Sequence, residues 1–209
     1  MNMTSMTDIT IMNMIIDNIP SITYMSISSN GTDDSQEEKT HNLQQRAGSC
    51  RANDWDGTQY CTCESWQRIS TFASDHDNHR EDRRWSLQCG DIMPSDVAKR
   101  TTWRRQWSGF LNNWDQSFHW NGGDTCFMSG MYSYHNNHHE DRRYQVLYSC
   151  SDDWILSGCT GWIWLNGYDG KVDHRLGSNQ VINALLSSHH NHHEDRRFVI
   201  RVCNLVPRC

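Results

Sequence analysis

Histidine, carboxylate and guanidinium side chains are concentrated in one short motif that occurs three times in this chain. The copies are HDNHREDRRW, HNNHHEDRRY and HHNHHEDRRF, which begin at His76, His135 and His189. A turn that presents His-x-x-His beside a carboxylate has the ligand types that Zn²⁺ or Cu²⁺ prefers. Each turn is therefore a candidate site for a divalent metal, formed by the pairs His76/His79, His135/His138 and His189/His192.

Two other interpretations of these histidine-rich turns stay open. Neutral imidazoles titrate near a pKa of about 6.5, so the turns would suit a pH switch in adhesion. His and Asn side chains also cap backbone groups in solvated turns that bind nothing. Duplication of one hairpin copies its histidines whether or not they bind a ligand, so repetition alone does not decide. We favour the solvated turn and expect no required cofactor.

The second half of the motif, Glu-Asp-Arg-Arg and an aromatic residue, is predicted to start a strand. Period-two alternation would place Glu81, Arg83 and Trp85 on one side, with Asp82 and Arg84 on the other. A buried arginine needs a carboxylate for its planar fork and tolerates an aromatic ring along its stem. We expect salt-bridged corners that fix how the units meet, rather than a ligand-binding or catalytic role. The predicted corner residues are Asp82, Arg83, Trp85, Asp141, Arg142, Tyr144, Asp195, Arg196 and Phe198.

Each motif copy lies between two segments that favour strands. The preceding segments are RISTFA, FMSGMY and VINALL, and the following ones are WSLQC, YQVLYSC and FVIRVC. β-branched and aromatic residues favour strands, so each unit is predicted as strand, polar turn and strand. Units of about 55 residues, joined by long irregular connections, predict an all-β fold. We expect three repeated, disulfide-bonded hairpin units in a compact pseudo-threefold domain, similar to a trefoil or a prism.

The cysteines predict how the hairpins are closed. Nine cysteines favour disulfides in an oxidising compartment, because Cys61-Thr-Cys63 is too short for a zinc knuckle. The turns at His76 and His138 each lie midway between two cysteines, and a hairpin can bring such a pair to the ~5.5 Å Cα spacing of a disulfide. The predicted pairs are Cys63 with Cys89, Cys126 with Cys150, and Cys203 with Cys159 or Cys209, while Cys50 and Cys61 are unassigned.

Composition and motif content exclude several classes of protein. A formal net charge of -6 argues against a general nucleic-acid binder, whose footprint is usually basic. Ten Trp, seven Tyr and five Phe provide enough apolar burial for a folded chain. No run approaches the ~20 apolar residues that span a bilayer. No nucleophile–base pair or pair of carboxylates stands apart from the repeat, so we do not expect an enzyme.

The first thirty residues differ in composition from the rest. They are rich in Met and Ile, lack a basic start and are interrupted by Asp8 and Asp17, so they fit a signal peptide poorly. Their alternating apolar positions suit a strand that docks on another surface, although a tail without fixed structure is the alternative. Asn30 begins a glycosylation sequon. The predicted segments are an arm (1–30), a polar linker (31–49) and a domain (50–209) with units at about 50–95, 110–151 and 152–209.

A basic cluster interleaved with indoles follows the first motif copy. Its charges would attract sulfate groups and its rings would stack on sugar faces, so it suits a sulfated polysaccharide. The alternative is a surface loop with buried tryptophans. The candidate glycan-binding residues are Lys99, Arg100, Trp103, Arg104, Arg105 and Trp107.

The repeated Asp-Arg-x-aromatic sequence followed by cysteine resembles the dermatopontin family and the related invertebrate haemagglutinin and cell-aggregation factors. The signature of that family is a repeated Asp-Arg-x-Trp followed by cysteine. Residues 82–85 with Cys89 match it fully, and the copies at Asp141 and Asp195 match it with Tyr and Phe in place of Trp. The resemblance covers roughly residues 50 to 209. Asn-x-Trp-Asp openings that end at Asp56 and Asp115 are also similar to the family.

This resemblance implies a secreted, disulfide-bonded protein of the extracellular matrix without enzymatic activity. It implies lectin-like binding of glycosaminoglycan, proteoglycan or cell-surface carbohydrate, which is the function we expect first. The alternative is a structural subunit of an extracellular fibre, which assembles with itself or another fibre protein through residues 1–30. Metal-dependent adhesion through the histidine turns is a third hypothesis.

Overall fold

The computed structural model describes residues 48–208, which form strands and one short helix. The all-β prediction is confirmed. The arm, Asn30 and Cys209 lie outside the described residues, as does most of the linker. The elements are β1 Ser49–Arg51, β2 Gln59–Thr62, β3 Gln67–Asp77, β4 Asp82–Trp85, β5 Gln88–Asp91, α2 Ser95–Arg100, β6 Arg104–Trp107, β7 Phe118–Asn121, β8 Cys126–Asn136, β9 Asp141–Cys150, β10 Trp154–Ser157, β11 Ile163–Trp164, β12 Val172–Arg175, β13 Gln180–His190 and β14 Asp195–Pro207.

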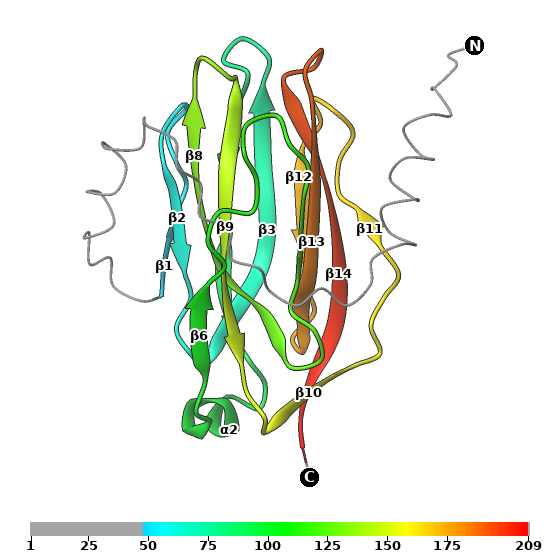
Figure 1. Ribbon diagram of the computed structural model, residues 1–209. Coiled ribbons are helices and arrows are strands. Elements are labelled where there is room, and N and C mark those ends of the chain that lie inside the picture. Colours follow the sequence, from blue (N-terminus) through cyan, green and yellow to red (C-terminus); the bar gives the residue numbers. More distant parts are fainter. Residues whose placement is uncertain (1–47, 209) are drawn as a thin grey trace. The chain divides into compact units, whose positions relative to one another are not determined.

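The three motif copies form the turns of three antiparallel hairpins, β3–β4, β8–β9 and β13–β14. Each hairpin belongs to a different sheet, and the three turns lie together at one end of the described part (the top of Figure 1). The sheet orders are β12-β3-β4 with β5 on β3, β1-β2-β8-β9-β6, and β10-β14-β13-β7 with β11 on β14. The histidine turns are therefore neighbours in space although they are far apart in the sequence.

Each sheet also contains a strand that precedes a different hairpin in the chain. Strand β2 pairs with β8, β7 pairs with β13, and β12 pairs with β3. A hairpin alone is marginally stable in water, and these exchanged strands widen each sheet. The units consequently interlock in a cycle instead of folding side by side. Symmetry about a threefold axis and the bounds of the units stay predictions.

The aromatic residue that ends each motif copy lies in the main core. Trp85, Tyr144 and Phe198 are at most 1% exposed. Their rings meet edge to face, with centroids 5.0 Å apart for Trp85 and Phe198, 5.8 Å for Tyr144 and Phe198, and 6.2 Å for Trp85 and Tyr144. Aromatic pairs favour this arrangement, and each ring buries a large apolar area. The motif therefore supplies one large core residue from every hairpin.

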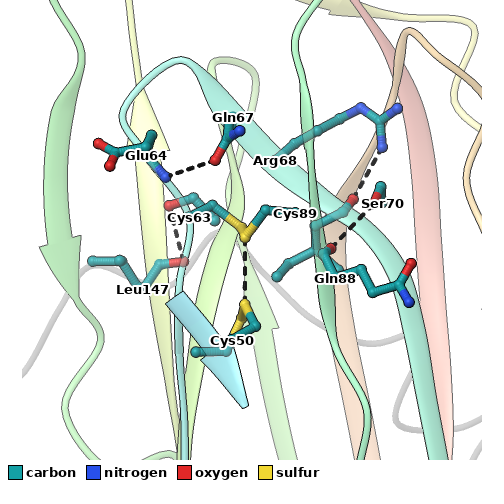
Figure 2. Close-up of a disulfide and its surroundings, with 12 residues drawn as sticks. Cys50, Cys63, Glu64, Gln67, Arg68, Ser70, Gln88, Cys89 and Leu147 are labelled. Carbon is teal, nitrogen blue, oxygen red and sulfur yellow. Dashed lines mark hydrogen bonds between the residues drawn. A yellow bond between two sulfur atoms is a disulfide. The ribbon is translucent and has the colours of Figure 1, made fainter. Parts of the chain in front are cut away.

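Four disulfides connect the described residues. The two mirrored pairs predicted from the sequence are present, and Cys203 bonds to Cys159. The remaining bond joins Cys50 to Cys61 across β1 and β2. It lies beside the bond between Cys63 and Cys89, because the Sγ atoms of Cys50 and Cys89 are 3.3 Å apart (Figure 2). The cysteines thus tie the hairpin ends and the adjoining strands. No helix among the described residues is long and apolar enough to cross a membrane.

Candidate functional site

In each motif copy, the arginine directly after the aspartate of Glu-Asp-Arg-Arg forms an ion pair with the corresponding aspartate of another copy. Nε and Nη2 of Arg83 donate hydrogen bonds of 2.7 and 2.6 Å to the two carboxylate oxygens of Asp195. Both side chains are at most 3% exposed, so the planar fork and the carboxylate satisfy each other away from water. The other two pairs are also bidentate. Together they close a ring through Arg83–Asp195, Arg196–Asp141 and Arg142–Asp82.

Each aspartate of this ring also accepts a backbone hydrogen bond from a loop of its own unit. Asp82 accepts the N–H of Asp56 at 2.8 Å, and the N–H groups of Asp115 and Asp169 bind Asp141 and Asp195 in the same way. Burial alone would raise the pKa of the Asp82 carboxyl. The approach of His135 and the hydrogen bonds from Arg142 outweigh burial and hold this pKa well below its usual range. Asp82 is therefore ionised beside Arg142.

Six acidic residues beside the ring have left-handed backbone conformations. The φ angles lie between 41° and 61°, and these are the only positive φ values outside glycine in residues 48–208. Such a conformation is unfavourable for most side chains and persists where surrounding contacts enforce it. Because Glu81 adopts it, the strand begins at Asp82, and the prediction that Glu81 belongs to the strand is wrong. The residues are Asp56, Glu81, Asp115, Glu140, Asp169 and Glu194.

Both sides of the strand start are buried, which the alternation did not predict. Asp82 and Arg83 are each at most 3% exposed, whereas Arg84 is exposed. The two buried side chains pair with different neighbouring hairpins, so each side of the strand is covered. The aromatic side chain that packs on the Arg83 guanidinium is Phe198 of another hairpin, whose ring centroid lies 5.7 Å from Cζ of Arg83. The corners therefore lie between hairpins.

The first histidine of each motif copy is buried against carboxylates. The side chains of His76, His135 and His189 are at most 1% exposed, and all three line a cavity at the ring. His79, His138 and His192 are exposed on the turns, and no potential metal-ligating cluster in residues 48–208 includes them. The structure thus separates the members of each predicted His-x-x-His pair. In their place, the ligating atoms of His76, Asp169 and Asp195 all lie within 4.8 Å of one another, as do those of His189, Asp115 and Asp141.

The last arginine of each copy, directly before the motif's aromatic residue, packs on aromatic rings at the outer surface. Cζ of Arg84 lies 5.2 Å from the centroid of Trp55. Arg143 lies 4.3 Å from Phe110, and Arg197 lies 4.2 Å from Trp164. These distances are typical of cation–π contacts. Arg143 and Arg197 also lie over Trp114 and Tyr168, which occupy the position of Trp55 in the loops of the other two units.

An Asn-x-aromatic-Asp loop opens every unit and braces the strand of the motif. In the first unit Asn53 donates to the carbonyl of Arg83 and accepts the N–H of Trp85. Asn112 and Asn166 make the corresponding bonds in the other units. The third loop, Asn-Gly-Tyr-Asp from Asn166, escaped the sequence reasoning because Tyr replaces Trp. Its spacing ahead of the motif was the signal that could have revealed it.

The predicted glycan-binding cluster is partly neutralised and partly buried. Arg100 pairs with Asp96, and Arg104 forms a bidentate pair with Asp152. Arg105 donates to a backbone carbonyl, and burial lowers the pKa of its guanidinium. Trp103 packs against Trp154 and Phe127, and Trp107 against Tyr60. Lys99, Arg100 and Arg104 are thus exposed, whereas Trp103, Arg105 and Trp107 are half-buried, and glycan binding by this cluster stays a prediction.

Comparison with known proteins shows which family this chain resembles over its described part. The family model described as Dermatopontin matches residues 53–209. The chain is 33% identical over 158 residues to the hemagglutinin/amebocyte aggregation factor of Limulus polyphemus, covering 73% of this chain and 86% of that protein. It is 29% identical over 184 residues to Millepora cytotoxin-1 of Millepora dichotoma, covering 88% and 77% of the two chains.

A third relative is the dermatopontin of Biomphalaria glabrata, which is 27% identical over 143 residues and covers 68% of this chain and 90% of that protein. No solved structure matches the chain significantly. The resemblance first seen in the motif is thereby confirmed, and this chain belongs to the dermatopontin family.

Proposed function

We propose that this protein is a secreted, non-enzymatic adhesion protein that binds anionic carbohydrate of the extracellular matrix or the cell surface. The observation that carries the proposal is the similarity over most of the chain to a protein named as a hemagglutinin and aggregation factor. Four disulfides among the described residues fit an oxidising extracellular compartment.

The outer arginine–aromatic contacts are a better carbohydrate surface than the cluster from Lys99 to Trp107. Trp164 is 42% exposed while its ring holds Arg197, and Phe110 is 36% exposed beside Arg143. An exposed ring can stack on a sugar, and a guanidinium can pair with a sulfate or carboxylate in bidentate fashion. These contacts lie outside the ion-pair ring, so recognition and architecture use different arginines of the same motif.

Heparin chromatography and a glycan array test this proposal. Trp164→Ala with Phe110→Ala should elute from heparin at lower salt and lose array signal, because both stacking faces are removed. Lys99→Ala with Arg104→Ala is the matched control for the basic cluster and should elute close to the unmodified protein. Failure of the unmodified protein to bind heparin at low salt, together with an empty array, would remove the proposal.

Assembly of a fibre through residues 1–30 stays a prediction, since that segment lies outside the described residues. Deletion of the arm followed by a measurement of oligomeric mass tests it. A mass per particle that is unchanged by the deletion would exclude this role.

A further inference from the structure

Both ring nitrogens of each buried histidine face carboxylate oxygens. For His135, Nδ1 lies 3.2 Å from Asp82 and Nε2 lies 3.4 Å from Glu140. A neutral imidazole has one donor nitrogen and one acceptor nitrogen. The acceptor nitrogen therefore points its lone pair at a carboxylate, and only a positive charge between the two makes the contact favourable.

The other two buried histidines repeat this arrangement. Nδ1 of His76 lies 3.3 Å from Asp195, and its Nε2 lies 3.7 Å from Asp169. The nitrogens of His189 lie 3.6 and 3.7 Å from carboxylate oxygens of Asp115 and Glu194. Within residues 48–208, none of the six imidazole nitrogens has a hydrogen bond of acceptable geometry, although all are buried. An unsatisfied buried polar atom destabilises the fold, so these unpaired nitrogens point to a ligand.

Negative charge gathers at the same place. Three aspartates are balanced by the arginines of the ring, but the six acidic residues with left-handed φ add further carboxylates around it. The glutamates of the three turns, Glu81, Glu140 and Glu194, line one cavity of about 10 Å³ together with the histidines and the arginines of the ring. These carboxylates are therefore close enough to repel one another.

We propose that two of these histidines bind a divalent first-row cation, His76 together with Asp169 and Asp195, and His189 together with Asp115 and Asp141. Zn–N and Zn–O bonds of about 2.1 Å place tetrahedral ligands roughly 3.4 Å apart. The nitrogens of the two histidines lie 3.3 to 3.7 Å from carboxylate oxygens of Asp195, Asp169 and Asp115, which brackets that value. The ion would reach the buried nitrogens from the turn end, where Asp169 and Asp115 are 33% and 37% exposed.

The ligand types select the class of ion. One imidazole with two or three carboxylates suits Zn²⁺, whereas Ca²⁺ prefers six to eight oxygen ligands. Each cluster also joins two units, because His76 comes from the first hairpin while Asp169 and Asp195 belong to the third unit. Bound zinc would thus clamp the ion-pair ring, and this site differs from the exposed His-x-x-His pairs of the turns.

Thermal unfolding of the full, oxidised chain with added Zn²⁺ tests the proposal. If ions occupy both sites of the folded state only, at about 100 times their dissociation constant, Tm should rise by about 10–20 °C, and EDTA should reverse the shift. Ca²⁺ at the same concentration should produce a much smaller shift. An unmodified protein whose Tm does not respond to Zn²⁺ overturns the proposal.

Two variants locate the sites. Asp115→Asn with Asp169→Asn removes one carboxylate from each cluster and should abolish the Zn²⁺ shift. Asn tolerates the left-handed conformation of both positions, so the variant should still fold without metal. His79→Asn, His138→Asn and His192→Asn together remove the exposed histidines and should keep the shift. If the histidine variant loses the shift or the aspartate variant keeps it, the buried sites are rejected.

Discussion

Removal of Asp82 from the ion-pair ring should destabilise the protein far more than removal of an exposed aspartate with the same kind of partner. Asp82 accepts hydrogen bonds of 2.6 and 2.8 Å from Arg142 and of 2.8 Å from the backbone of Asp56. Asp82→Ala leaves the Arg142 guanidinium buried without its carboxylate. Breaking such a pair from one side costs about 3–5 kcal/mol.

The expected loss can be read as a melting temperature. For a domain of this size, 1 kcal/mol corresponds to about 2–4 °C, so Asp82→Ala should lower Tm by roughly 6–20 °C. Differential scanning calorimetry on the oxidised protein measures this directly. Adding Arg142→Met should recover most of the loss, because a buried ion pair and an apolar replacement of similar volume are often equal in stability.

The exposed pair between Arg104 and Asp152 is the matched control. Its two hydrogen bonds are 2.8 and 3.1 Å long, but the side chains are 60% and 73% exposed. Water and salt screen such a pair, so Asp152→Ala should leave Tm nearly unchanged. Equal losses for Asp82→Ala and Asp152→Ala would refute the reasoning that burial gives the ring its importance.

Three further predictions concern the core and the hairpin ends. Burial raises the pKa of the Tyr144 hydroxyl, so the hydroxyl stabilises the fold below its unfolded pKa of about 10, and this stabilisation is lost as the pH rises further. The Tyr144→Phe variant should therefore lose less free energy of unfolding than the unmodified protein between pH 9 and about 11 in urea titrations. A Cβ on Gly130 would overlap the carbonyl oxygen of Cys61, so Gly130→Ala should lower the free energy of unfolding by about 1–3 kcal/mol in the same titrations. The control Gly161→Ala has open space around the added Cβ and should leave the free energy of unfolding nearly unchanged. Replacement of Cys126 and Cys150 by alanine should cost about 3 kcal/mol, and an unchanged midpoint would show that this disulfide does not constrain the unfolded chain.

The hairpins and their disulfides could be predicted because their signals are local. Motif spacing placed the turns, and cysteines equidistant from a turn must meet when two strands pair. The direction of the ion pairs could not be predicted, since Arg83 might equally have paired within its own unit. Its partner Asp195 is chosen by the exchange of β2, β7 and β12 between sheets, which is a property of the whole fold.

The histidine–carboxylate clusters could be predicted only in part, because they too depend on contacts between distant parts of the chain. Period-three spacing suggested His76 with His79, but the two side chains diverge where the strand gives way to the turn. The actual neighbours of His76 are Asp169 and Asp195, about a hundred residues away in the chain. Composition also could not show that Trp103 of the basic cluster packs against a second core while Trp107 packs against Tyr60.

The central claim is that aspartate and arginine of different motif copies lock the hairpins into one ring. Double-mutant cycles between every aspartate and every arginine of the ring measure it most directly. We predict the largest coupling energies, about 2–3 kcal/mol, for Asp82 with Arg142, Asp141 with Arg196 and Asp195 with Arg83. Stronger coupling of each aspartate to the arginine beside it in its own motif would contradict the account.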